Sequence, residues 1–199
     1  MPDHLALGSP TYLALLGLLV IARAMDFLST WIATPNLVLE GNPIARRLGW
    51  RYGLPLNLVV CLGFAAWPVP AIIITTTSLL VAARNFQSAW LMRTMGEEAY
   101  RDWHVHHIRV GSVTLLVACL AGQTMLLAVV GLGLVYFSAA DNIPWAIGIG
   151  IIAYAAAVAV YSGLALWRIR REGPVLPVDS SVRKPDALGL PEIAQPRND

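Results

Sequence analysis

The chain has 199 residues, of which 57% are hydrophobic and 13% are charged, and its formal net charge is +2. A soluble domain carries about 25% charged residues, so this composition excludes an ordinary water-exposed globular protein. The small positive charge gives no reason to expect nucleic acid as a partner. The apolar stretches are continuous rather than alternating, which excludes a membrane β-barrel. The sequence therefore predicts an all-α, polytopic transmembrane bundle whose main partner is the lipid bilayer.

Three apolar stretches are each long enough to span a bilayer as one helix, which takes about 20 residues. Tryptophans lie near the ends of these stretches, where aromatic rings favour the level of the lipid headgroups. The three predicted spans are residues 11–33, 111–137 and 144–167.

The first span carries two charged residues in its interior, Arg23 and Asp26. A charge at the bilayer centre costs about 2.5–3.5 kcal/mol on insertion scales, so it normally has a partner. The two residues are three apart and share a helix face. Two interpretations stay open: a structural ion pair supported by Ser29 and Thr30, or a proton-titrating or cation-binding carboxylate at Asp26.

The sequence Glu40-Gly41-Asn42-Pro43 follows this span. Asn42 suits a helix cap and Pro43 suits the first turn of the helix that it would start. Glu40 has no such role and adds a second carboxylate near the membrane. The predicted buried polar site consists of Arg23, Asp26, Ser29, Thr30, Glu40 and Asn42.

Residues 53–85 allow two arrangements, because Pro68 and Pro70 interrupt the backbone hydrogen bonds of a helix. Either residues 53–67 and 70–88 form a hairpin of two spans, giving five spans in all, or one long kinked helix makes the second of four spans.

The arginines favour the hairpin. With four spans, the arginines that follow the first span lie opposite those that precede the third. With five spans, ten arginines lie on one side of the membrane and none on the other, which the positive-inside rule favours. The sequence thus predicts a multi-pass protein of the cell inner membrane with its N-terminus outside and its C-terminus cytoplasmic. The ten are Arg46, Arg47, Arg51, Arg84, Arg93, Arg101, Arg109, Arg168, Arg170 and Arg171.

Residues 86–103 have the pattern of an amphipathic helix that lies in the headgroup layer. Glu97 is four residues from Arg93 and from Arg101, so ion pairs along this helix are expected. The region after residue 168 is rich in proline and mixed charge. We therefore predict a transmembrane domain over 1–168 and a disordered cytoplasmic tail over 169–199.

His104, His106 and His107 follow the amphipathic segment. Histidine is the commonest metal ligand, although this spacing matches no defined zinc motif. With five spans, Glu40 and the histidines would lie at the same membrane face and could bind a divalent metal ion. The alternative is a solvated or headgroup-facing cluster.

The pattern Asp26-Phe27-Leu28-Ser29-Thr30 followed by Glu40-Gly41-Asn42-Pro43 resembles a family of small, uncharacterised prokaryotic membrane proteins. The hallmark of that family is an Asp-x-x-Ser/Thr-Thr-like span followed by Glu-x-Asn-Pro. The resemblance covers residues 20–90. It implies a common membrane module and supplies no reaction.

Three classes of function fit this sequence. The first is a non-enzymatic scaffold, assembly or accessory protein, acting as a homo-oligomer or with a membrane-protein partner. The second is a membrane-embedded metal- or proton-dependent enzyme at the cytoplasmic leaflet, and the third is a small ion-coupled transporter. The sequence has no nucleophile elbow and no zinc-protease helix motif, which weighs against the enzyme and favours the first class.

Overall fold

The computed structural model describes residues 2–40 and 43–171, with the backbone alone for residues 43–45. This part of the chain is all-helical. Four of its helices, of 24 to 29 residues, are long and apolar enough to cross a membrane: α1, α3, α5 and α6. The six helices are α1 (Pro10–Ala33), α2 (Pro43–Phe64), α3 (Pro68–Met95), α4 (Glu97–Val110), α5 (Val113–Tyr136) and α6 (Ile143–Arg171).

The helix boundaries follow from local chemistry. Ser9 caps α1 by accepting a hydrogen bond from the Tyr12 backbone N–H at 3.2 Å, with proline in the first turn. Ser112 caps α5 in the same way. Gly96 separates α3 from α4 with a φ of 83°, a conformation that glycine adopts at little cost.

The predicted break at the prolines is present, since α2 ends at Phe64 and α3 begins at Pro68 after a turn over 65–67. Residues 53–85 are therefore two helices and not one kinked rod. The five-span prediction is nonetheless not confirmed, because α2 is not among the helices long and apolar enough to cross. Only about 20 Å of helix separates Arg51 from Phe64, and a hydrocarbon core is about 30 Å thick.

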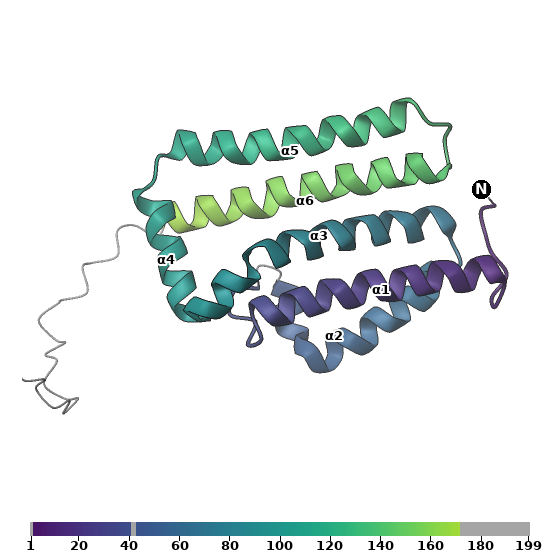
Figure 1. The fold of residues 1–199 in the computed structure, drawn as a ribbon, viewed down its shortest axis with the longest axis horizontal. Helices are drawn as coiled ribbons and strands as arrows, with labels where there is room; N and C mark the ends of the chain where they lie inside the picture. The colour runs from purple at the N-terminus through teal and green to yellow at the C-terminus, as the bar shows by residue number, and fades with distance from the viewer. Residues whose placement is uncertain (1, 41–42, 172–199) are drawn as a thin grey trace, which may run out of the picture.

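Two hydrogen bonds fix the direction of the first three helices. The Leu5 backbone N–H donates to the Ala66 carbonyl at 2.9 Å, which places the α2–α3 turn beside the start of α1. Thr34 Oγ1 donates to Glu97 at 2.7 Å, which places the end of α1 beside the start of α4. Helices α1 and α3 therefore run parallel. Helix α2 connects them and runs in the opposite direction (Figure 1).

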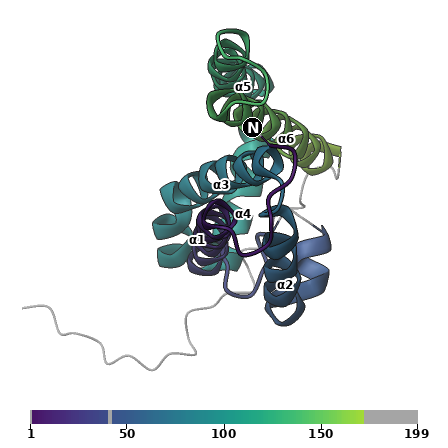
Figure 2. The ribbon, with the colours of Figure 1, turned by 90° about the vertical axis from the view of Figure 1, so that its right-hand side faces the viewer.

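The helices are arranged in a row. Viewed along their length, α5, α6, α3 and α1 follow one another, and α2 lies beside α1 and α3 (Figure 2). Helix α4 crosses the bundle at the end where α3 stops and α5 starts (Figure 1). We call this the basic end, because the ends of α3 and α6, the start of α2 and all of α4 carry nine arginines there. These are Arg46, Arg47, Arg51, Arg93, Arg101, Arg109, Arg168, Arg170 and Arg171.

The opposite end, which we call the turn end, consists of residues 2–9, 65–67 and 137–142. It has no lysine or arginine, and its acidic residues are Asp3 and Asp141. The two ends therefore differ sharply in charge.

The predicted amphipathic helix has different bounds in the structure. Residues 86–95 continue α3, and the crossing helix α4 starts at Glu97 and includes the three histidines. The expected ion pairs of Glu97 with Arg93 and Arg101 were wrong, because Gly96 separates Arg93 from Glu97 and the Glu97 carboxylate binds the loop after α1 instead. Arg101 instead lies 3.4 Å from Asp102 and 4.0 Å from Glu98. The first residues of the predicted tail, 169–171, are the last residues of α6, and residues 172–199 lie outside the described part.

Candidate functional site

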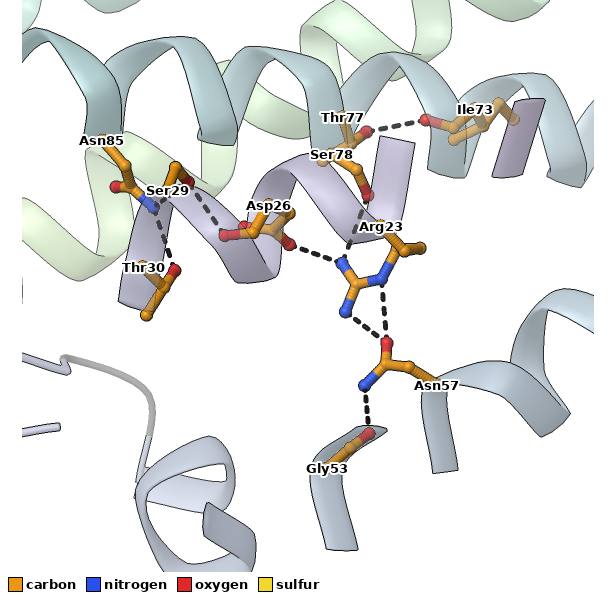
Figure 3. A network of polar contacts seen from close by, with 10 residues as sticks. All are labelled: Arg23, Asp26, Ser29, Thr30, Gly53, Asn57, Ile73, Thr77, Ser78 and Asn85. Atoms are coloured by element: carbon orange, nitrogen blue, oxygen red, sulfur yellow. Dashed lines mark hydrogen bonds and ion pairs between the residues drawn. The ribbon is translucent and has the colours of Figure 1, made fainter. Parts of the chain in front are cut away.

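Arg23 and Asp26 form an ion pair within α1, with Arg23 Nη1 2.7 Å from Asp26 Oδ2 (Figure 3). Their side chains are 26% and 16% exposed. Arg23 also donates to Ser78 of α3 at 3.2 Å, and its guanidinium lies 5.6 Å from the Phe27 ring. Through these contacts Arg23 joins α1 to α3.

Asn57 extends the network to α2. Its Oδ1 accepts from Arg23 Nε at 2.8 Å and also from Nη2, while its Nδ2 donates to the Gly53 carbonyl at 2.8 Å (Figure 3). Helix α2 packs much less against α1 and α3 than these two pack against each other. The Arg23–Asn57 contact is therefore a main attachment of α2.

A second group of polar contacts lies one turn further along α1. Ser29, which is fully buried, donates to the Asp26 backbone carbonyl at 2.8 Å. Asn85 of α3 donates to Ser29 at 3.3 Å and to Thr30 at 3.2 Å (Figure 3). Ser29 and Thr30 thus hold α1 against α3.

The predictions from sequence did not include Asn57, Ser78 or Asn85. Each is a polar residue within a mostly apolar stretch. That is a usable signal, because polar side chains inside membrane helices normally face other helices. Their partners depend on which helices are neighbours, and the sequence does not specify that.

A cavity of about 700 Å³ adjoins this network at the half of the molecule toward the basic end. Helices α1, α2, α3 and α6 and the loop after α1 all contribute to its wall. Apolar residues such as Leu56, Val81 and Val158 make up much of the lining. Its polar and charged residues are Arg23, Asp26, Thr30, Thr34, Glu40, Asn57, Arg84, Asn85, Tyr154, Tyr161 and Ser162.

The structure therefore brings together Arg23, Asp26, Thr30 and Glu40 of the predicted polar site around one cavity. Ser29 lies behind that wall, and Asn42 lies outside the described residues. A kink in α2 at Gly49, where φ is 61°, contributes to the same wall. Trp50 follows it, donates from Nε1 to the Pro35 carbonyl at 2.9 Å and so ties α2 to the loop after α1.

Glu97, the first residue of α4, binds the loop that follows α1. Its carboxylate accepts hydrogen bonds from Thr34 Oγ1, from the Asn36 backbone N–H and Nδ2, and from the Val38 backbone N–H, at 2.7 to 3.1 Å. Burial alone would raise the pKa of Glu97, but these hydrogen bonds lower it below its ordinary value. This contact positions the loop that carries Glu40.

The three histidines lie on α4 among aromatic rings. His104 stacks on Tyr100 with ring centroids 5.8 Å apart, and His107 lies 4.4 Å from Trp103. Burial, and to a smaller extent His107, lowers the pKa of His104. Within residues 2–40 and 43–171, no three His, Cys, Asp or Glu side chains are grouped so that they could hold a metal ion. A metal site at His104, His106 and His107 stays a prediction.

The fold and the cavity thus describe a helical bundle of the membrane-protein class. Compared with family models, with curated proteins and with solved structures, the chain matches none. The resemblance of its Asp26 to Pro43 pattern to a prokaryotic membrane family therefore stays a prediction.

Proposed function

We propose that the chain is a non-enzymatic protein of the cell inner membrane, a lipid-associated scaffold or accessory protein that holds a membrane ligand in the cavity at its basic end. The cavity is the observation that carries this proposal. It is about 700 Å³ in volume, within the range of small-molecule sites, and combines apolar walls with a few polar groups.

The polar network supports an architectural role for its charged residues. Asp26 is ion-paired with Arg23, and Arg23 is further engaged by Asn57 and Ser78. Through these contacts the charged pair joins α1, α2 and α3. The network therefore suits a wall that holds the helices in place beside a bound ligand.

The proposed orientation has the basic end in the cytoplasm, with the N-terminus outside and the C-terminus inside. The charge difference between the basic end and the turn end supports it. Single cysteines at Asp141 and at Arg101, in a background lacking Cys61 and Cys119, test it by labelling in vesicles. D141C should react in right-side-out vesicles and R101C only in inverted ones, and the reverse pattern would refute this orientation.

Filling the cavity tests the function. Ala157 lines the cavity, whereas Ala159, two residues along α6, is exposed and does not. We expect A157W to reduce the lipid that co-purifies with the protein after exhaustive detergent washing, measured by mass spectrometry of the extracted lipids. A159W is the matched control and should retain the wild-type amount. Equal retention in both variants would contradict the proposal.

Ion-coupled transport is a second candidate, because Asp26 and Glu40 line the same cavity. Substituting these two carboxylates by their neutral amides discriminates between transport and the scaffold function. If ions drive transport through this cavity, D26N and E40Q should abolish uptake into proteoliposomes while the folded protein remains abundant. A scaffold would lose abundance with D26N and show no uptake in any variant.

A further inference from the structure

Arg84, like Arg23, lies in the interior of a helix that is long and apolar enough to cross a membrane. Helix α3 has 28 residues, which is about 42 Å of helix and exceeds the hydrocarbon thickness of about 30 Å. If α3 enters the hydrocarbon at Pro68, Arg84 lies about 24 Å along it, a few ångströms before the opposite boundary. Lipid phosphates lie just beyond that boundary, so Arg84 is at a depth that suits a phosphate.

The guanidinium of Arg84 has few protein partners. It carries five N–H donors, and its Nη2 donates to Ser162 Oγ at 3.4 Å, longer than the usual 2.7–3.2 Å. In the described part of the chain no carboxylate forms an ion pair with it. Arg23, by contrast, is bound by a carboxylate, an amide and a hydroxyl. An arginine at this depth normally has a partner, so Arg84 indicates an anionic ligand.

The surroundings of Arg84 define the ligand further. Tyr161 and Ser162 of α6 line the cavity with it, and Tyr161 is 55% exposed, so its hydroxyl is accessible. Much of the remaining lining is aliphatic. A ligand that fits must therefore combine one anionic group with an apolar body. The aliphatic lining includes Leu56, Val81, Ala157, Val158 and Ala165.

Two carboxylates, Asp26 and Glu40, also line the cavity. Asp26 is neutralised by Arg23 at 2.7 Å. Glu40 belongs to the loop beyond the end of α1 and lines the same cavity. Of the two arginines in the lining, Arg84 is the one with which no carboxylate of the described residues forms an ion pair, and it contacts Ser162 directly.

We infer that Arg84, Tyr161 and Ser162 form a binding site for the phosphate of a phospholipid, with its acyl chains against the aliphatic wall between α2 and α6. This inference rests on the proposed function, since it names the ligand class of the same cavity. A guanidinium forms strong, charge-assisted hydrogen bonds with phosphate oxygens, and the two hydroxyls supply further donors. The apolar body and the depth of Arg84 favour a lipid over a free phosphate ion.

The experiment titrates the purified full chain, delipidated in detergent, by calorimetry. The three probes are a short-chain phosphatidylglycerol, a diacylglycerol with the same chains, and sodium phosphate. We expect the phospholipid to bind at least about tenfold more tightly than the diacylglycerol, because the latter lacks the phosphate. Sodium phosphate should show no binding at the same concentrations. Equal binding of both lipids, or binding of phosphate alone, would overturn the inference.

Variants of Arg84 assign the effect to this residue. R84Q should weaken phosphatidylglycerol binding about tenfold or more, and R84K should restore most of it, because a charged donor remains. Arg93 also lies on α3, is exposed and does not line the cavity, so R93Q is the matched control and should bind like the wild type. If R84Q fails to fold, the double variant Y161F/S162A provides the same test. Unchanged affinity in the folded variants would overturn the inference.

The result separates this inference from the proposed function. If A157W loses lipid but R84Q binds phosphatidylglycerol normally, the cavity holds a ligand and the phosphate assignment is wrong. If A157W, A159W and the wild type all retain the same lipid, the proposed function itself fails.

Discussion

The helices α1, α2 and α3 are held together in a different way from the helices α5 and α6. Charged and amide side chains join the first three, through Arg23, Asp26 and Asn57. Within the described residues no side-chain hydrogen bond joins α5 to α6. Close glycine contact joins that pair instead, since a Cβ at Gly131 would lie 2.8 Å from the Gly148 carbonyl oxygen. Polar contacts leave room for a cavity, whereas glycine contacts close the space between helices.

Breaking the Arg23–Asp26 ion pair should have the largest effect on stability, because it holds α1, α2 and α3 together. R23A leaves the carboxylate of Asp26 without a partner inside the membrane. We expect it to cost about 2–4 kcal/mol of stability, somewhat below the value for a fully buried pair because both side chains keep partial exposure. Thermal unfolding of the purified protein in detergent measures this loss.

The double variant R23A/D26A serves as the control for this prediction. It removes both charges and should recover part of the stability lost in R23A, because no unpaired charge remains. If R23A alone were as stable as the wild type, the ion pair would not be a structural element.

A substitution at Gly131 tests the contact between α5 and α6 in the same way. G131A places a methyl group 2.7 Å from Ile152 Cγ1 and against the α6 backbone, which should cost about 1–3 kcal/mol. Gly133, two residues along α5, has no atom within 4 Å of a Cβ, so G133A is the matched control. We expect thermal unfolding to show a loss for G131A alone. Equal stability of the two variants would mean that α5 and α6 do not pack through Gly131.

Removing the amide at Asn57 should loosen α2 without unfolding the bundle. N57A removes the acceptor of two hydrogen bonds from Arg23, but the guanidinium keeps Asp26 and Ser78 as partners, so we expect a loss of about 1–2 kcal/mol. Hydrogen exchange should therefore increase along α2 and remain unchanged in α5 and α6. L58A, at a neighbouring exposed position, is the control and should leave exchange unchanged. Faster exchange in every helix would argue against a local attachment.

The smallest expected effect concerns Glu97. Because its pKa in the folded protein is lower than its ordinary value of 4.5, its contribution to stability is fully present above that value and is lost as the pH falls through the lower, folded-state pKa. E97Q should reduce stability at neutral pH and flatten this acid dependence. E98Q, at an exposed neighbour, should keep the wild-type profile. Thermal unfolding between neutral and acid pH measures both, and identical profiles for E97Q and the wild type would refute the role of Glu97.

Much of the fold could be predicted from the sequence, because apolar stretches of sufficient length determine membrane helices on their own. The segments corresponding to α1, α5 and α6 and the break at Pro68 all follow from local properties. The bounds of α4 did not follow from local properties. A pattern of apolar and polar residues continues smoothly from residue 86 to 103, and only the backbone conformation at Gly96 shows where α3 ends and α4 begins.

For the site, the sequence by itself determined which side chains are costly in a membrane, and so it marked Arg23, Asp26 and Glu40. Tertiary structure alone decided their partners and surroundings. Asn57 and Arg84 are separated from Arg23 by 34 and 61 positions, and only the return of the chain through α2 brings them to one cavity. The physical reason is that the desolvation cost of a charge is a property of one residue, whereas the compensation for it depends on which helices pack side by side.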